Sequence, residues 1–212
     1  MRSPQSMKAL EELGRVRLSP NFFFRDFLYS EISNFYGVPN IPDDPDTAIL
    51  AASGLCERLL EPLTEAFGKI SIRSGYRSPT LNEFGNSKKM NCGSNAYNRA
   101  HHIFDWRDKN GRLGATATIV VNAFIDLYEE TGDWPALAWF IHDHLPYQSM
   151  WFYPKLAAFN LNWNEAEGRD SIKSYVTPKG LLTKIGMANY EGDHSAAYDY
   201  PLFKQAARRL RA

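Results

Sequence analysis

Four of the five histidines in this sequence of 212 residues occur in two close pairs. His101 and His102 precede Asp105, and the second pair is His142 and His144. Imidazole and carboxylate groups are the usual protein ligands of a catalytic zinc ion, which keeps one open position for water. We therefore interpret these residues as candidates for a metal-dependent hydrolytic site.

Local geometry limits which of these side chains can share one ion. In an extended strand, His101 and Asp105 lie on one face but about 13 Å apart. At the end of a helix, His142 and His144 project about 200° apart, and an interaction with the terminal carbonyls is an equally good interpretation of the pair. His194 lies in a polar segment, where we expect it to be exposed rather than to act as a ligand.

Arginines flank the turn at Gly75, with Arg73 before it and Arg77 after it. A guanidinium group in such a turn can bind a carboxylate through two parallel hydrogen bonds. The alternative, which we weigh equally, is an arginine that satisfies carbonyl groups of its own loop.

The hydrophobic pattern predicts the elements that position these residues. Apolar residues at helical spacing predict helices over 7–16, 21–36, 47–67, 134–144 and 201–210. Alternating or β-branched residues predict strands over 69–73, 101–106, 149–153, 158–163 and 172–176. The segment 115–130 fits either a helix or a strand followed by a helix, and the polar segment 81–93 predicts an exposed loop with at most one helical turn. The predicted fold is α+β, with helices packed on one face of a small, mostly antiparallel sheet.

The bulk composition excludes some classes of partner. Equal numbers of basic and acidic residues, 24 each, leave no net charge to attract nucleic acid or an anionic membrane. No apolar run predicts a membrane span or a secretory signal, so we expect synthesis in the cytoplasm. Trp and Tyr residues cluster between 134 and 163, which favours a core over a platform for a flat ligand. We expect a main domain over 18–185, a helical extension over 1–17, and a loop with a basic helix over 186–212.

Several segments in a fixed order resemble a known family. They lie at 21–27, 37–42, 60–63 and 72–82, and the most specific is Ser74-Gly75-Tyr76-Arg77-Ser78. Together they resemble the zinc D-alanyl-D-alanine peptidases of the M15 type, well over residues 18–106 and loosely over 145–165. The resemblance implies a hedgehog/DD-peptidase-like fold, a zinc cofactor, peptidoglycan stem peptides as substrates, and a substrate-binding role for Arg77.

The zinc motif of that family is altered in this chain. The motif Ser-x-His-x-x-Gly-x-Ala-x-Asp places its aspartate on Asp105 and its first histidine on Asn98, and the later histidine position holds Asn164. A neutral amide is a poor zinc ligand, and no acid stands at Leu161 to serve as the general base. A working site therefore requires replacement ligands from the nearby histidines.

Three hypotheses of function remain open. The first is a metal-dependent hydrolase with a rewired zinc site, in which His101 and His142 are catalytic and the metal ligands are Asp105, His101, His102 and His144. The second is an inactive pseudoenzyme that binds a peptide or peptidoglycan-derived ligand or serves as a structural or phage-associated module. The expected ligand-binding residues in both are Arg77, Ser78, Asn98 and Asn164. A third alternative is metal-free chemistry at Asn98, His101, Asp105 and Asn164.

Overall fold

The computed structural model describes residues 1–166 and 168–211. They divide into two compact units that are built from interleaved parts of the sequence. Unit 1 consists of residues 1–57, 74–117 and 163–165, and unit 2 consists of 58–73, 118–162 and the described part of 166–212. The predicted division into an extension, a main domain and a C-terminal segment stays a prediction.

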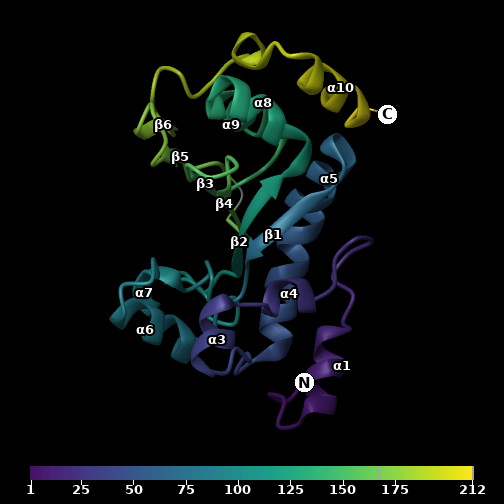
Figure 1. Cartoon of the computed structure of the whole chain (residues 1–212), viewed down its shortest axis with the longest axis vertical. Coiled ribbons are helices and arrows are strands. Elements are labelled where there is room, and N and C mark those ends of the chain that lie inside the picture. Colours follow the sequence, from purple (N-terminus) through teal and green to yellow (C-terminus); the bar gives the residue numbers. More distant parts are fainter. Residues whose placement is uncertain (167, 212) are drawn as a thin grey trace. The chain divides into compact units, whose positions relative to one another are not determined.

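Unit 1 is mainly helical (Figure 1). Its helices are α1 (Met7–Gly14), α2 (Arg25–Leu28), α3 (Glu31–Tyr36), α4 (Pro45–Leu55), α6 (Pro79–Ser87) and α7 (Asn95–Asn98). Most of them begin at a residue whose side-chain oxygen accepts a backbone N–H of the first turn, namely Ser6, Ser30, Asp44, Ser78 and Ser94. These caps satisfy donors that have no partner inside the helix, so the helix starts are fixed locally.

A six-stranded mixed sheet has the strand order β1-β2-β4-β3-β5-β6 among the described residues. The strands are β1 (Ile70–Ser74), β2 (Gly114–Val121), β3 (Ser149–Phe152), β4 (Phe159–Asn164), β5 (Ser171–Ser174) and β6 (Gly180–Lys184). Strand β3 pairs antiparallel with β4 and parallel with β5, and β5 pairs antiparallel with β6. The predicted α+β class is confirmed, whereas the hedgehog/DD-peptidase-like fold stays a proposal.

Unit 2 has a helix near its first residues and another near its last residues. Its helices are α5 (Glu61–Phe67), α8 (Ile125–Thr131), α9 (Trp134–His144) and α10 (Pro201–Arg209), with 3₁₀ turns at Asn122–Phe124 and Ser195–Tyr198. A π-helical segment, Cys56–Leu60, precedes α5, and its first two residues belong to unit 1. Helix α10 lies beside α5 (Figure 1), and Arg209 Nη1 donates to the carbonyl of Ala66 at 3.1 Å. In the described part of the chain, no helix has the length and apolar character that crossing a membrane requires.

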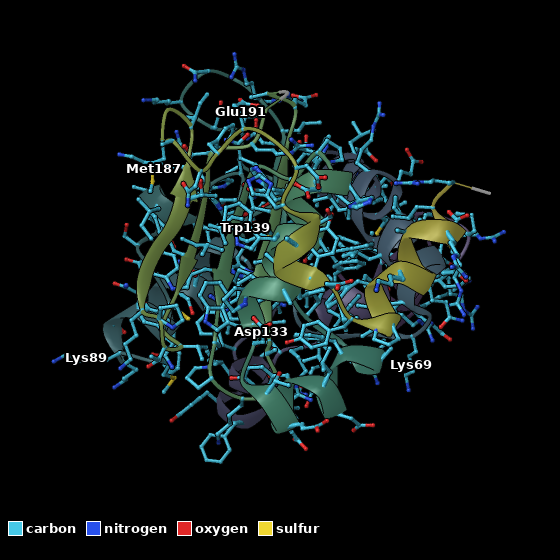
Figure 2. The ribbon with its side chains drawn as sticks, turned by 90° about the horizontal axis from the view of Figure 1, so that it is seen from above. Lys69, Lys89, Asp133, Trp139, Met187 and Glu191 are labelled. Carbon is cyan, nitrogen blue, oxygen red and sulfur yellow. The ribbon has the colours of Figure 1, made fainter. Side chains whose placement is uncertain are left out.

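Aromatic side chains form the core of unit 2. The ring of Phe140 lies 5.0 Å from that of Phe67 and 5.4 Å from that of Phe203. Trp134 and Trp139 are buried, and Figure 2 shows Trp139 on α9, between the strands and the C-terminal helical segments. This part of the predicted aromatic cluster is therefore core, because burying large rings against one another removes much apolar surface from water.

Two element predictions are wrong, and both errors lie near the expected site. Residues 101–106 form successive turns instead of a strand, with one isolated bridge between Arg99 and Ile103. Ala100 has a left-handed φ of 54°, and the N–H groups of His101 and Ile103 both donate to the carbonyl of Asn98, which bends the chain. The segment that we expected to be a loop over 81–93 starts instead within α6, because Ser78 caps a helix with Pro79 in its first turn. The ambiguous segment 115–130 is a strand followed by a helix.

Gly54 lies where α4 packs against the ring of Trp163 in unit 1. A Cβ atom added at Gly54 would overlap Cη2 of Trp163, so the indole ring lies directly on this glycine. We expect Gly54→Ala to lower the free energy of unfolding by about 1–3 kcal/mol, because overpacking outweighs the better helix propensity of alanine. Urea denaturation measures this change, and Ser53→Ala on the same helix is the control. A Gly54→Ala variant as stable as the wild type would contradict this packing.

Candidate functional site

The buried carboxylate of Asp105 fastens two parts of unit 1 together. Its Oδ2 accepts the backbone N–H of Asp43 at 2.8 Å and that of Asp44 at 3.3 Å, and the hydroxyl of Tyr76 donates to both carboxylate oxygens at 3.2 Å. Burial raises the pKa of Asp105, although these hydrogen bonds favour its charged form. Asp105 thus connects the residues that precede α4 with the segment after β1 that carries Tyr76.

His102 connects the same turns to Gly75. Its Nδ1 lies 2.7 Å from the carbonyl oxygen of Gly75, and the backbone N–H of Arg77 donates to the carbonyl of His102 at 2.7 Å. The carbonyl partner requires a proton on Nδ1. Burial lowers the pKa of His102 well below its usual value, and the nearby Arg77 charge acts in the same direction. His102 is therefore a neutral, structural imidazole at pH 7.

His101 points away from that contact. Its ring stacks on Tyr97 at 5.6 Å with an interplanar angle of 6°, and its Nδ1 lies 3.3 Å from the hydroxyl of Thr116. Burial lowers the pKa of His101. In an extended strand, His101 and His102 would lie on opposite faces, and the observed turns also give them separate partners.

Arg77 and Ser78 follow the turn at Gly75. Their side chains differ in the hydrogen-bonding capacity that is left for a ligand. The hydroxyl of Ser78 caps α6 by accepting from the N–H of Leu81 at 3.2 Å, so it is a structural group. Arg77 is half-buried and donates to Ser74 Oγ at 3.3 Å and to Cys92 Sγ at 3.5 Å. Because sulfur is a weak acceptor, this guanidinium keeps donor capacity for a ligand.

The two asparagines at the expected zinc positions make amide hydrogen bonds. Asn98 is buried, and its Nδ2 donates to Asn82 Oδ1 at 2.9 Å and to the carbonyl of Gly93 at 3.2 Å. Asn164 donates to the carboxylate of Asp108. The amide nitrogen of Asn98 is held by two acceptors, and the atom left to ligate at the position of the first family histidine is a neutral amide oxygen, which is a poor zinc ligand.

Among the residues that the structure describes, one group of side chains places possible metal-binding atoms close together. It consists of His142, Asp143 and His194 in unit 2, whose ligand atoms lie within 4.8 Å of one another. The predicted ligand set of Asp105, His101, His102 and His144 is not this group. That set draws on both units, and its use of a shared ion stays a prediction.

Asp143, near the end of α9, lies at ion-pair distance from His194. His194 Nδ1 lies 2.6 Å from Asp143 Oδ1, and its Nε2 lies 3.0 Å from the carbonyl oxygen of Asn189. Because both ring nitrogens face acceptors, the doubly protonated ring satisfies both of them. Asp143 Oδ2 also accepts from the hydroxyl of Tyr198 at 2.8 Å.

The prediction that His194 is exposed is wrong. Its side chain is 12% exposed, and its ring stacks on Trp139 at 4.1 Å with an interplanar angle of 8°. The charged partner Asp143 lies 51 residues away in the sequence. No local spacing links the two residues, so tertiary packing alone brings them together.

His142 is held by partners on both ring nitrogens. Nδ1 lies 2.7 Å from the hydroxyl of Tyr147, and Nε2 lies 2.7 Å from the carbonyl oxygen of Tyr190. The carbonyl requires a proton on Nε2, so the hydroxyl of Tyr147 donates to Nδ1. Burial lowers the pKa of His142, with a smaller contribution from the charge of Arg169.

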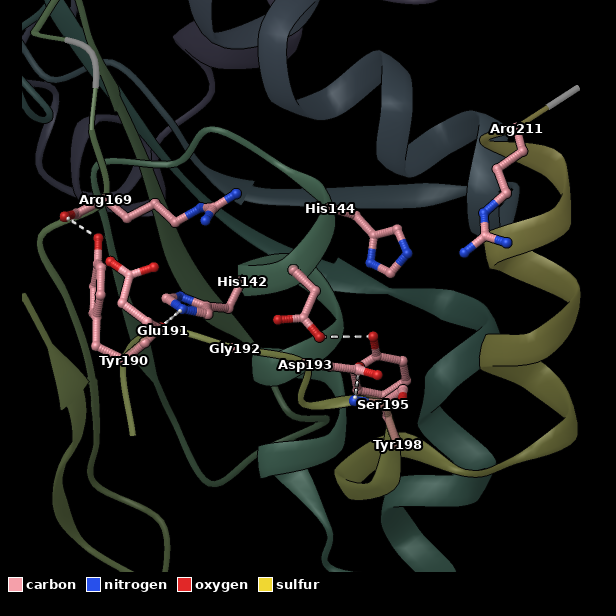
Figure 3. A pocket seen from close by; sticks show the side chains of 11 residues that line it. His142, His144, Arg169, Tyr190, Glu191, Gly192, Asp193, Ser195, Tyr198 and Arg211 are labelled. Carbon is pink, nitrogen blue, oxygen red and sulfur yellow. Dashed lines mark hydrogen bonds between the residues drawn. The ribbon is translucent and has the colours of Figure 1, made fainter. Parts of the chain in front are cut away.

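His144 faces a cavity of about 420 Å³ in unit 2. Its Nδ1 donates to the carbonyl of Phe140 at 2.9 Å, which leaves Nε2 with a lone pair and with no hydrogen-bonding partner among the described residues. Figure 3 shows this imidazole between the guanidinium groups of Arg169 and Arg211. The cavity wall therefore combines a potential base with two cations, a combination that sequence spacing did not reveal.

Three histidines that are wholly or partly buried make the free energy of unfolding depend on pH. The pKa values of His101, His102 and His142 are lowered by burial, so between these values and about 6.5 the unfolded chain binds more protons than the folded one. We therefore expect the free energy of unfolding to fall as the pH decreases below about 6.5. Urea denaturation at pH 7.5 and 5.5 measures this loss, and His102→Asn should show a weaker dependence. Equal stability at both pH values would contradict neutral burial.

Comparisons with known proteins return no relative of this chain. No family model matches it, and no curated protein or solved structure matches it either. The resemblance to the M15-type peptidases therefore rests on the motifs of the sequence alone.

Proposed function

We propose that unit 1 is a DD-peptidase-like module that binds a peptide or peptidoglycan-derived ligand without metal-dependent hydrolysis. The observation that carries this proposal is the use of Asp105, which holds the aspartate position of the family motif. Its carboxylate accepts from Asp43, Asp44 and Tyr76, so its lone pairs serve the fold. A metal ion at this position would have to displace those donors.

The surroundings of Asp105 support the same proposal. Asn98 directs its amide nitrogen at Asn82 and Gly93, and His102 is fixed on the carbonyl of Gly75. Arg77 keeps donor capacity because its partners are a hydroxyl and a sulfur atom. Binding of a carboxylate group at Arg77 is thus compatible with the loss of the metal ligands.

Replacing Asp105 separates a structural role from a metal-binding one. We expect Asp105→Asn to lower the free energy of unfolding by about 1–3 kcal/mol, because an amide cannot accept at both positions. The metal content of the purified protein, measured by mass spectrometry, should be the same before and after the change. Loss of bound metal or of a hydrolytic activity in this variant would overturn the proposal.

Two further variants complete this test. Asp43→Asn changes an exposed carboxylate next to the same contact and should leave stability unchanged. Arg77→Gln should weaken the binding of a peptide with a free carboxylate, measured by calorimetry, while a peptide amide should bind both proteins alike. Equal binding of the two peptides to the wild type would argue against a ligand at Arg77.

The group of His142, Asp143 and His194 favours a second candidate, a metal-dependent hydrolase with its ion in unit 2. Two imidazoles and one carboxylate are a common ligand set for zinc. His142 and Asp143 line the cavity that His144 faces, and His194 contacts Asp143. A metal ion would replace the proton on a ring nitrogen of His194, so its affinity should increase with pH.

Calorimetric titration of metal-free protein with zinc tests this candidate. We expect one ion per chain, with binding lost in Asp143→Asn and in His194→Gln. His101→Gln, which changes a histidine of unit 1, is the matched control and should bind zinc normally. Zinc binding that persists in both unit 2 variants would exclude this group as the site.

A further inference from the structure

Arg169 is held by a hydrogen bond to the main chain and has no acidic partner among the residues that the structure describes. Its Nε donates to the carbonyl of Leu145 at 3.2 Å, and its own carbonyl accepts from the hydroxyl of Tyr190 at 2.7 Å. The side chain is half-buried, and none of the ion pairs among the described residues involves it. A guanidinium held by its Nε keeps its terminal N–H groups as a preorganised fork.

The carboxylates of the cavity wall are mostly occupied. Asp143 accepts from His194 and Tyr198, and Asp193 Oδ1 accepts from the N–H of Ser195 at 2.8 Å. Glu191, which is exposed, is the lining carboxylate without a hydrogen bond among the described residues. The acids of the wall therefore leave the fork of Arg169 available.

A second guanidinium, that of Arg211, gives the cavity a cationic side together with Arg169. Arg211 lines the wall and points towards His144, and the Arg169 guanidinium lies on the other side of that imidazole (Figure 3). The volume of about 420 Å³ is within the range of small-molecule sites. A small anion in this space would meet guanidinium donors and the Nε2 side of His144.

We propose that this cavity binds a small oxyanion, a carboxylate or phosphate group, through the terminal N–H groups of Arg169. Arg211 adds positive charge on the far side of His144. Glu191, which also lines the cavity, opposes the anion by repulsion. The site depends on neither the peptide ligand of unit 1 nor a metal ion at His142, Asp143 and His194.

Nuclear magnetic resonance titration of the whole chain tests the proposal. Inorganic phosphate and acetate are added separately in the presence of EDTA, at constant ionic strength set with chloride, while the ring signals of His144 are followed. We expect saturable shifts with at least one anion, and a dissociation constant at least about tenfold higher in Arg169→Gln. Saturation by phosphate alone assigns a phosphate group, and saturation by acetate alone assigns a carboxylate.

Three further variants keep the result specific. Glu191→Gln should bind the anion more tightly, because it removes the repelling charge. Arg169→Lys keeps the charge but lacks the fork and should bind more weakly than the wild type, and circular dichroism verifies that each variant is folded. Arg208→Gln removes an exposed charge of α10 outside the cavity and should bind normally. Absence of saturation with both anions, or equal affinity of Arg169→Gln and the wild type, would overturn the proposal.

Discussion

Burial of a carboxylate requires hydrogen-bond donors, and this constraint organises unit 1 around Asp105. The donors are two consecutive backbone N–H groups, of Asp43 and Asp44, and the hydroxyl of Tyr76. Tyr76 itself is fully buried beside Phe104, at a ring distance of 5.6 Å. The charged group and the aromatic core thus stabilise each other, because the core excludes water while Tyr76 supplies one of the donors.

The same constraint acts at the end of α9 in unit 2. The carboxylate of Asp143 accepts hydrogen bonds from His194 and Tyr198, which lie in a distant part of the sequence, and the ring of Trp139 stacks on the imidazole ring. These contacts hold the 3₁₀ turn of residues 195–198 against α9. His142 and Asp143 also line a cavity of unit 2. In unit 2, residues of the structural network therefore also line the cavity for which we propose anion binding.

Most elements of the fold could be predicted from periodicity. Helix α9 has the bounds that its apolar spacing indicated, and β3, β4 and β5 lie where alternation placed strands. The prediction failed at residues 101–106, where an apolar alternation is overridden by the left-handed Ala100 and by side chains that find buried partners. Periodicity reports which residues are apolar, and it does not report which polar groups must be satisfied locally.

The sequence by itself determined α9, the segments of β3, β4 and β5 and the residue types that can do chemistry, because hydrophobic spacing acts over a few residues. It also identified Asp105 as a central residue, although it suggested a metal for it. Only the tertiary structure decided the partners: Asp43, Asp44 and Tyr76 for Asp105, and His194 for Asp143. These pairs are 29 to 62 residues apart, and contacts over such separations depend on how the whole chain packs.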